Sequence, residues 1–370
     1  MDSAKKYVQD RFNSADIIIN GNRPFDIQVK DERFYNRVLL NGALGLGEAY
    51  MDSWWDCPQL DEFINRLLKI TPNEKTRKFK EFGLIIKAVI SNMLSGVKSS
   101  ESVNKHYDLG NELFKNTLDK RMLYTCGYWK DADNLDDAQE AKLDLICRKL
   151  NLKPGQNILD IGCGWGSFEK FAAERYEVNV VGISKSKKQI EYAQSLCKGL
   201  PVEIRFQDYK EINEQFDHIL VMGMIENIGS KNFRNFMNVV SNNLNPKGLF
   251  LLHTIGSRKS SRSTDPWFDK YIFPNGVLPS EKQISTATEG IFVLEDWHNF
   301  GSDYDKTLME WHKNFIGNWE SIKDSYDERF YRMWTYYLLS AAGGFRSRKN
   351  QLWQIVFSKN GVPGGYESVR

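Results

Sequence analysis

The sequence predicts an α/β protein organised around a doubly wound, mostly parallel sheet. Three observations support this prediction. Short apolar segments typical of buried strands alternate with amphipathic segments typical of helices between residues 157 and 254. A glycine-rich turn joins the first of these strands to the helix that follows it. Polar side chains stand at or just beyond the ends of several predicted strands, where doubly wound sheets bind ligands.

The composition describes a globular protein with room for one large domain and a smaller one. The chain has 370 residues, of which 41% are hydrophobic and 26% are charged. Its net charge of +2 does not indicate a nucleic-acid partner. The five cysteines are widely spaced and form no C-x-x-C pair, so we expect reduced thiols, no disulfide framework and no metal site. Aromatic residues make up 13%, which suits either an ordinary core or a long apolar tunnel.

No segment has the pattern of a membrane span or of a secretion signal. No apolar run approaches the ~18 residues that a bilayer requires, and residues 1–20 lack a continuous apolar stretch. We therefore expect a cytoplasmic protein.

Residues 1–68 predict a small α/β domain. Alternating apolar residues at 25–29 indicate a half-buried strand, and residues 61–68 indicate a helix after Pro58. The glycines between residues 44 and 48 indicate a turn.

Residues 69–105 predict a basic amphipathic helix and a linker. Apolar residues recur at helical spacing from Phe79 to Leu94, and Lys and Arg outnumber Glu around them. Such a helix can dock on anionic lipid headgroups, or it can pack against a neighbouring helix of the same protein. The pattern leaves both interpretations open.

The large domain, residues 106–370, opens with two segments in which polar and aromatic residues are mixed, 106–114 and 121–129. Cys126 lies among these aromatic residues, where a lone cysteine is usually a packing residue. An amphipathic helix is expected at 135–150.

Strands and helices then alternate, which predicts a parallel sheet with helices on both faces. Two later strands have no short crossover helix between them and would close a seven-stranded sheet in antiparallel fashion. Helical insertions near 258–289 and 303–345 would sit over the carboxyl edges of the strands as a substrate lid. The expected strands are 157–161, 179–183, 202–206, 216–222, 248–254, 291–295 and 352–357, and the expected crossover helices are 186–198 and 231–243.

The turn after the first strand contains glycines at alternate positions, 162, 164 and 166. Without β-carbons there, a ligand can lie against bare backbone near the start of the next helix. The dinucleotide fingerprint G-x-G-x-x-G is not met, and Asp160 at the strand end suits a cationic or hydroxyl-rich ligand better than a pyrophosphate. The pattern D-x-G-x-G-x-G is typical of an S-adenosylmethionine site, and a glycine-rich turn without a ligand is the alternative.

Other polar residues fall at the predicted ends of neighbouring strands. If the strands are ordered as usual, Glu226 and His253 face the same crevice. A histidine that ends a buried strand is also often a satisfied core residue. The further residues at such ends are Ser184, Gln207 and Asp208.

Eight short segments resemble those of bacterial cyclopropane-fatty-acyl-phospholipid synthases, and the resemblance runs nearly from end to end. It implies a class I methyltransferase domain joined to a small N-terminal lipid-binding domain. It also implies a homodimer that acts on membrane phospholipids from the inner face of the cytoplasmic membrane. The segments are 107–111, 124–129, 159–166, 223–226, 252–256, 265–267, 271–276 and 297–301.

The resemblance implies transfer of a methylene group from S-adenosylmethionine to the cis double bond of an unsaturated acyl chain. The carbocation formed on the way must lose a proton, and in this family a bound bicarbonate is the base. The residues similar to its ligands are Cys126 and Ile255 through backbone N–H groups, and Glu226, His253 and Tyr304 through side chains.

For the cofactor, the resemblance implies that methionine and ribose lie on Gly162, Gly164 and Gly166 beside Asp160. Tyr124 and Thr125 would cover them. Ser184 stands where such folds commonly have an acidic residue, and Gln189, Gln207 and Asp208 would bind ribose and adenine.

Two other functions remain open from the sequence. One is an S-adenosylmethionine-dependent methyltransferase of another lipid or of a small molecule, and the basic segment at 69–105 argues against a soluble substrate. The other is a lipid-binding protein with a vestigial methyltransferase domain. Intact residues at 126, 226, 253 and 304 argue against the latter.

Overall fold

The structure is a computed structural model that describes residues 3–70 and 110–370. The predicted helix from Phe79 to Leu94 lies outside the described residues. Within them the chain forms two compact units, of which the first comprises residues 3–70, 265–274 and 320–347. The second comprises residues 110–264, 275–319 and 348–370. Two segments that we expected in the large domain therefore belong to the first unit.

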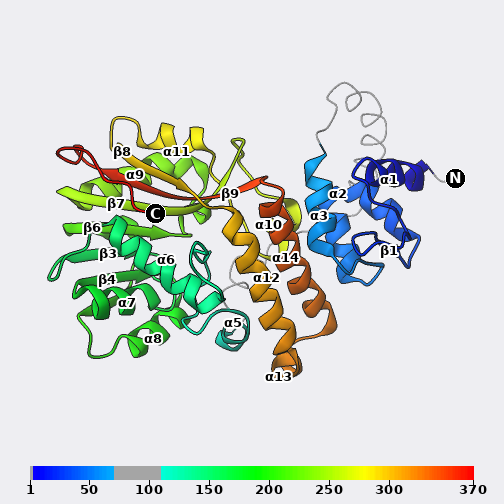
Figure 1. Ribbon diagram of the computed structural model, residues 1–370, viewed down its shortest axis with the longest axis horizontal. Coiled ribbons are helices and arrows are strands. Elements are labelled where there is room, and N and C mark those ends of the chain that lie inside the picture. The colour runs from blue at the N-terminus through cyan, green and yellow to red at the C-terminus, as the bar shows by residue number, and fades with distance from the viewer. Residues whose placement is uncertain (1–2, 71–109) are drawn as a thin grey trace. The chain divides into compact units, whose positions relative to one another are not determined.

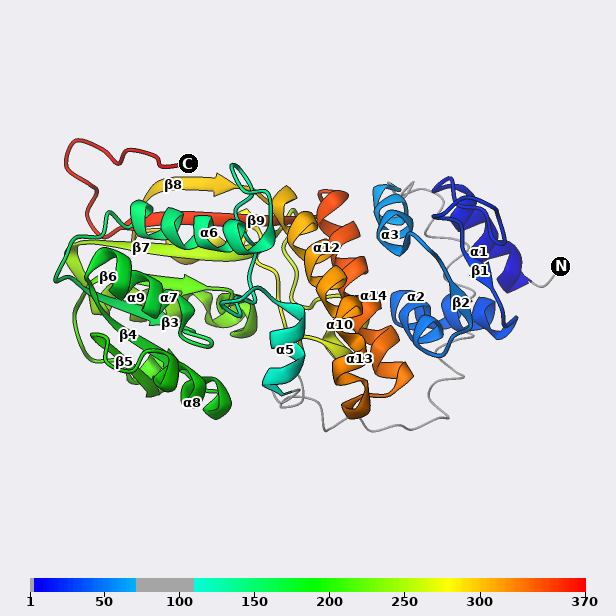
Figure 2. The same cartoon turned by 60° about the horizontal axis from the view of Figure 1, so that its bottom comes forward.

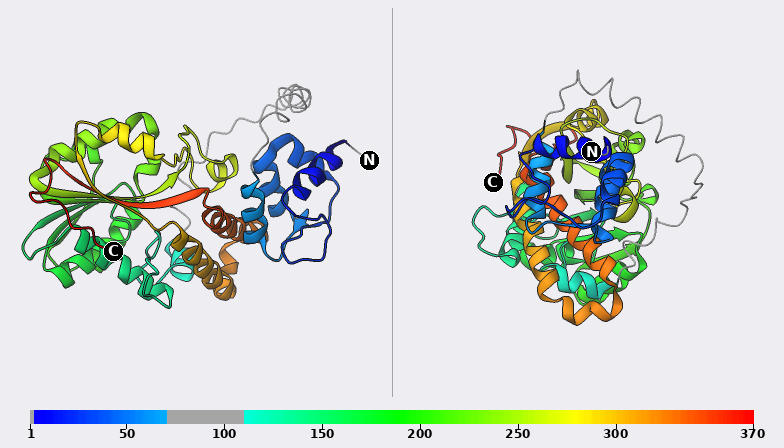
Figure 3. Two further views of the ribbon diagram at one scale, coloured as in Figure 1. Left: turned by 45° about the horizontal axis from the view of Figure 1, so that its top comes forward. Right: turned by 90° about the vertical axis from the view of Figure 1, so that its right-hand side faces the viewer.

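The second unit contains a seven-stranded sheet in the order β5-β4-β3-β6-β7-β9-β8. The five strands from β5 to β7 are parallel, and β9 pairs antiparallel with both β7 and β8 (Figure 2). The predicted doubly wound, mostly parallel sheet is confirmed, and its strands fan out with a twist (Figure 3). The strands are β3 (Asn157–Ile161), β4 (Asn179–Ser184), β5 (Val202–Phe206), β6 (Phe216–Met222), β7 (Leu244–Ser257), β8 (Val293–Asn299) and β9 (Asn350–Ser358).

The strand order reverses at β3. From β3 the chain builds outward through β4 and β5, and it then returns to place β6 on the other side of β3. Ligands of doubly wound sheets bind at the carboxyl ends of the strands that flank such a reversal. The glycine turn follows β3, and Glu226 follows β6, so both lie at this position.

Helices cover both faces of the sheet (Figure 1). Leu143 of α6 and Phe168 of α7 are buried in the core on one face, and Phe236 of α9 and Ile284 of α11 are buried in the core on the other. The helices of this unit are α5 (Asn111–Thr117), α6 (Leu135–Lys149), α7 (Ser167–Tyr176), α8 (Lys187–Leu196), α9 (Phe233–Asn243), α11 (Glu281–Thr288) and α12 (Ser302–Gly317), with 3-10 turns at Tyr209–Glu211, Ile225–Asn227 and Ser230–Asn232.

The predicted lid is only partly correct. Helix α11 does not lie over the carboxyl edges of the strands, because Ile284 and Ala287 bury their side chains against α9 on the face of the sheet. Helix α12 packs against α5. The remaining parts of both predicted insertions, residues 265–274 and 320–347, fold with the first unit.

The first unit is mostly helical, which corrects the α/β expectation for residues 1–68. The strand expected at 25–29 is reduced to two residues, and Gly45 and Gly47 lie inside α2 where we expected a turn. A side chain at Gly47 would collide with the ring of Trp267, so close packing explains this glycine. The elements are α1 (Ser3–Asn13), β1 (Gln28–Val29), α2 (Arg33–Met51), β2 (Trp55–Asp56), α3 (Leu60–Lys69), α10 (Pro266–Tyr271) and α14 (Glu328–Arg346), and α13 (Trp319–Ile322) and a 3-10 turn (Lys323–Ser325) precede α14 in the chain.

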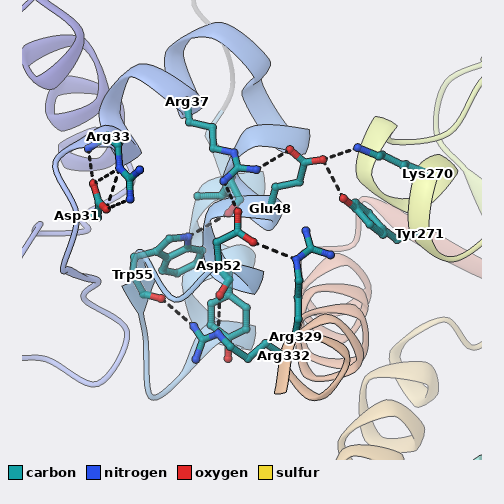
Figure 4. A network of polar contacts seen from close by, with 12 residues as sticks. Asp31, Arg33, Arg37, Glu48, Asp52, Trp55, Lys270, Tyr271, Arg329 and Arg332 are labelled. Carbon is teal, nitrogen blue, oxygen red and sulfur yellow. Dashed lines mark hydrogen bonds and ion pairs between the residues drawn. The ribbon is translucent and has the colours of Figure 1, made fainter. Parts of the chain in front are cut away.

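A network of ion pairs holds the later segments in the first unit (Figure 4). The Glu48 carboxylate accepts hydrogen bonds from Lys270 at 2.6 Å and Tyr271 at 2.9 Å, which join α2 to α10. Asp52 at the end of α2 accepts one from Arg329 of α14 at 3.0 Å. Within residues 3–70 and 110–370, no helix combines the length and the apolar content needed to span a bilayer.

Candidate active site

The turn after β3 leaves room for a ligand at one glycine. Gly162, Gly164 and Gly166 all have positive φ angles, of 105°, 54° and 87°, which favour glycine. A Cβ on Gly162 would lie 3.1 Å from Met224, and one on Gly166 would lie 2.9 Å from Ala193, so packing within the protein requires these two. A Cβ on Gly164 would have no atom of the described residues within 4 Å. The space beside Gly164 is therefore open to a ligand.

Tyr124 approaches this turn through a chain of aromatic contacts. The ring of Trp165, inside the turn, lies 4.9 Å from that of Phe114, which lies 5.2 Å from that of Tyr124. The Trp165 indole N–H donates to Asn111 at 3.1 Å. The segment before α6 is thus packed against the turn, as the predicted covering role of Tyr124 requires.

Two carboxyl groups are buried beneath the turn. Asp160 in β3 is paired in register with Gly182 in β4, and a Cβ on Gly182 would lie 2.7 Å from Oε1 of Glu169. Glu169 of α7 therefore occupies the space that a side chain at 182 would fill, beside Asp160. Both residues are fully buried, and within residues 3–70 and 110–370 none of their four carboxyl oxygens has a hydrogen-bond partner. Burial raises the pKa of both groups, and their mutual proximity adds to the shift for Glu169.

A buried lysine connects α6 to Thr125. Lys142 is fully buried, and its Nζ donates to Oγ1 of Thr125 at 2.8 Å. Burial lowers the pKa of Lys142 to about 8, although the carboxylates of Asp119 and Asp160 oppose this shift. One turn earlier on α6, the Gln139 amide donates to the carbonyl of Thr125 at 2.8 Å. Helix α6 thus holds both the backbone and the hydroxyl of Thr125.

Four candidate residues lie near one another but are partly engaged already: Ser184 at the end of β4, Gln189 in α8, and Gln207 and Asp208 just beyond β5. Oγ of Ser184 donates to Oε1 of Gln189 at 3.3 Å, and the Gln207 N–H donates to the Ser184 carbonyl at 3.3 Å. The Asp208 carboxylate accepts from Lys185 at 2.8 Å. Burial tends to raise the pKa of Asp208, but this lysine and the N–H of Lys210 lower it below its usual value. The sequence predicted Ser184, Gln207 and Asp208 at or just beyond strand ends and Gln189 on the helix after β4, and the roles of all four toward a ligand stay predictions.

Glu226 lies against β7. Its Oε1 accepts the N–H of Ile255 at 2.8 Å, and its carbonyl accepts the N–H of Val277 at 2.8 Å. Its Oε2 is buried and has no hydrogen-bond partner among the residues that the structure describes. Burial raises the pKa of Glu226, and the hydrogen bond from Ile255 opposes the shift. The two predicted residues Glu226 and Ile255 are therefore in direct contact, with the Ile255 N–H engaged by the carboxyl group.

His253 lies inside β7 and not at its end, because the strand continues to Ser257. It is 1% exposed and pairs in register with Met222, the last residue of β6. Nδ1 of His253 lies 3.3 Å from Nε2 of Gln354, and Nε2 of His253 has no hydrogen-bond partner in the described part of the chain. Burial lowers the pKa of His253 well below its usual value, with smaller contributions from Lys142 and Lys149, so the imidazole is neutral.

Helix α12 is anchored to the segment that contains Cys126. Oγ1 of Thr307 accepts the N–H of Gly127 at 3.1 Å and lies 3.7 Å from Sγ of Cys126, and Asp303 accepts the N–H of Trp129 at 2.8 Å. Tyr304 lies between these two anchors in the helix. Burial raises the pKa of the Cys126 thiol well above its usual value, so the thiol is neutral and the residue can contribute through its backbone.

Some residues that shape the site were not predicted from the sequence. Lys142 and Gln139 are polar residues on the apolar stripe of α6, and Lys149 is a third, so their helical spacing was a usable signal. Thr307 and Asp303 are four residues apart in α12, but nothing in the sequence connects them to residues 126–129. Glu169 gave no signal, because only the packing of α7 on β4 buries it. In the described part of the chain, no group of His, Cys, Asp and Glu side chains could hold a metal ion.

Known proteins resemble this chain in both sequence and structure. Residues 95–355 match the family described as mycolic acid cyclopropane synthetase. The cyclopropane-fatty-acyl-phospholipid synthase of Escherichia coli strain K12 is 50% identical over 370 residues, which are 100% of this chain and 97% of that protein. A cyclopropane synthase from Mycobacterium tuberculosis superimposes with a TM-score of 0.65 at 29% identity, over 69% of this chain and 96% of its own. A mycolic acid cyclopropane synthase complexed with SAH and CTAB has a TM-score of 0.65 at 30% identity, over 70% of this chain and 97% of its own.

The buried carboxyl pair predicts a pH-dependent effect of Glu169→Gln. Because the pKa values of Asp160 and Glu169 are raised on folding, their contribution to stability is intact at about pH 4 and is lost as the pH rises through the folded values. At about pH 8 we expect the melting temperature of the variant to exceed that of the wild type, by roughly 2–4 °C for each kcal/mol gained in the free energy of unfolding. At about pH 5 this difference in melting temperature should be smaller.

Thermal unfolding followed by circular dichroism at both pH values checks this. Glu174→Gln on the same helix is the control, since that side chain is exposed and should give no such difference. An equal change in melting temperature at the two pH values for Glu169→Gln would contradict the prediction.

Proposed function

Since the chain belongs to the mycolic acid cyclopropane synthetase family, and a mycolic acid cyclopropane synthase of similar structure is complexed with SAH, we propose a specific reaction for it. It transfers a methylene group from S-adenosylmethionine to the cis double bond of unsaturated acyl chains in membrane phospholipids. The observation that supports this most directly is a pair of buried, unpartnered polar atoms, Oε2 of Glu226 and Nε2 of His253, in a unit whose glycine turn is open to a ligand.

The glycine turn fits S-adenosylmethionine, which supplies the electrophilic methyl group when bound. The fit rests on the space beside Gly164, where residues 3–70 and 110–370 place no atom within 4 Å of an added Cβ. The proposed contacts to methionine and ribose come from the backbone at Gly162, Gly164 and Gly166, with Tyr124 and Thr125 above them. Ser184, Gln189, Gln207 and Asp208 are the proposed adenosine side of the site.

The residues around Glu226 also fit a small oxyanion, and bicarbonate in this position would supply the base for the reaction. Oε2 of Glu226 and Nε2 of His253 are buried polar atoms that lack a partner, and such atoms are costly unless a ligand pairs with them. Because burial raises the pKa of Glu226, its carboxyl group is more easily protonated and can then donate to an anion. Cys126 and Tyr304 complete the proposed ligand set together with Ile255, whose N–H would have to exchange its hydrogen bond to Oε1 of Glu226 for one to the anion.

The protein's own groups would also protect a cationic intermediate. Tyr304 is 7% exposed, and its ring lies 6.0 Å from that of Trp311, which in turn lies 5.3 Å from that of Tyr124. Aromatic faces stabilise a positive charge, and their burial keeps out water that would trap it. A phospholipid substrate further implies that the protein works peripherally at a membrane surface, and we propose that it does so as a homodimer.

Lipid analysis tests the proposed reaction as a whole. We expect lipids from cells that express the chain to contain monounsaturated acyl chains whose mass has increased by one methylene group. The same chains should stay unmodified in cells that express Tyr304→Ala. Mass spectrometry of the lipid extract checks this, and methylation of a headgroup or of a soluble compound with unchanged acyl chains would overturn the proposal.

For the cofactor, Gly164→Ala should weaken S-adenosylmethionine binding at least about tenfold, or ~1.4 kcal/mol, because the new methyl group enters the ligand's space. Gly164→Val should abolish binding. The matched control is Gly155→Ala, since Gly155 also has a positive φ, of 80°, and empty surroundings but precedes β3. Calorimetric titration measures the affinity, and equal affinity in both alanine variants would remove the turn as the cofactor site.

For the anion, we expect Glu226→Gln to slow ring formation while S-adenosylmethionine still binds, and added bicarbonate to restore part of the rate. The reason is that the amide changes the acceptor and donor pattern at Oε2. Glu211→Gln, on the surface, is the control. The wild-type rate should also fall in degassed buffer and recover on titration with bicarbonate. A wild-type rate that is unchanged by stringent removal of bicarbonate would show that a side chain takes the proton.

A further inference from the structure

Gln354 lies between two histidines in the middle of the sheet. In β9 it pairs in register with His253 of β7 on one side and with His298 of β8 on the other. Side chains of residues paired in register point to the same face, so the three form a row. Gln354 is fully buried, and His253 is 1% exposed. The sequence motifs and the proposed reaction give Gln354 no role.

The hydrogen bond between Gln354 and His253 determines which ring nitrogen carries the proton. Nε2 of Gln354, an amide nitrogen that can only donate, lies 3.3 Å from Nδ1 of His253. Nδ1 is therefore the acceptor. A neutral imidazole has a single N–H group, so its proton must be on Nε2.

His253 is neutral for reasons that lie outside this hydrogen bond. Its burial disfavours the charged ring, and Lys142 and Lys149 of α6 lower its pKa further. Glu226 belongs to the same proposed site, and burial raises its own pKa, so its carboxyl group favours the neutral form. Neither the two lysines nor Glu226 therefore favours a second proton on the imidazole.

The remaining ring nitrogen of His253 faces no protein partner. Nε2 is buried and lacks a hydrogen-bond partner among the described residues. With the proton on Nε2, the protein presents one buried N–H donor that only a ligand can satisfy. An oxygen with a negative charge is the acceptor that such a donor binds best.

We propose that Gln354 is a positioning residue that holds His253 in the Nε2–H form and so aims a donor at a small bound oxyanion. This inference rests on the proposed function for the identity of that anion, a bicarbonate. With the opposite tautomer, His253 would present a lone pair to the anion, and the contact would be repulsive. The amide therefore determines whether the histidine can bind the anion at all.

The sheet fixes Gln354 in this place. Its neighbours Trp353 and Ile355 are buried in the core on the opposite face of the sheet. A shift of β9 by one residue would turn the side chains of Trp353 and Ile355 away from this core and toward the opposite face of the sheet. The ring of Trp353 also lies directly over Gly256 of β7, where no side chain could be accommodated. The pairing of Gln354 with His253 is thus determined by core packing and not by the hydrogen bond alone.

Nitrogen-15 NMR of histidine-labelled protein tests the inference on the wild type, so the result does not depend on whether a Gln354 variant folds. The chain contains five histidines, so the His253 signals are assigned by comparison with His253→Asn. We expect the pattern of a neutral ring protonated on Nε2. A ring protonated on Nδ1, or a charged ring near neutral pH, would overturn the inference.

Activity measurements then test the consequence for the reaction. Gln354→Glu offers an acceptor to Nδ1 and should move the proton there, and kcat should fall roughly 100-fold, as for loss of one oxyanion donor, with KM for S-adenosylmethionine unchanged. Gln351→Glu is the matched control, because Gln351 is a buried residue of the same strand that bonds to Asn299 and Arg348. The same loss in Gln351→Glu, or an unchanged tautomer and kcat in Gln354→Glu, would refute the role of Gln354.

The two proposals fail in distinguishable ways. The tautomer is read from the free protein and does not depend on the reaction. Unmodified acyl chains in the lipid analysis would overturn the proposed function. If the NMR spectrum of the same protein shows the Nε2–H form, the assignment of Gln354 as the group that sets the tautomer is still supported.

Discussion

The pairing of β3 with its two parallel neighbours is the interaction on which the rest of the site depends. Its register places Asp160 beside Gly182 on one side and Leu220 on the other. Glycine at 182 leaves space that Glu169 fills, so the turn after β3 rests on a buried carboxyl pair. The same pairing brings the end of β6 next to the turn. The positions of both proposed ligands therefore follow from backbone hydrogen bonds of the sheet, and the side chains adapt to them.

Desolvation is the second common feature of the site. Lys142, Asp160, Glu169, Glu226 and His253 are all buried, and burial shifts the pKa of each toward the neutral form. A site of this kind has few permanent charges of its own. It suits chemistry that passes through a cation in an apolar substrate, because a strong nucleophile or bound water would react with that cation. Neutral donors and acceptors can still orient a small anion.

Several contacts in the site join segments that are far apart in the chain. Thr307 of α12 bonds to the backbone of Gly127, and Gln354 of β9 reaches His253 of β7. Each of these contacts depends on a late part of the sequence packing against an early or middle part. The first unit is built in the same way, since Glu48 in α2 is bonded to Lys270 and Tyr271, which come after most of the sheet. Long-range packing of this kind explains why local sequence patterns predicted the positions of individual residues but not their hydrogen-bond partners.

The sequence by itself determined the doubly wound sheet, its seven strands and the glycine turn, because these depend on local periodicity and on the conformations that glycine allows. It also placed Glu226 and Ser184 correctly at the ends of strands. Only the tertiary structure decided that residues 1–68 are mostly helical, that α11 packs on α9, and that residues 265–274 and 320–347 fold with the first unit. Only the tertiary structure showed which polar groups are buried and which residues they contact. The physical reason is that burial, pKa and hydrogen-bond partners are properties of distant segments brought together, and a one-dimensional pattern does not contain them.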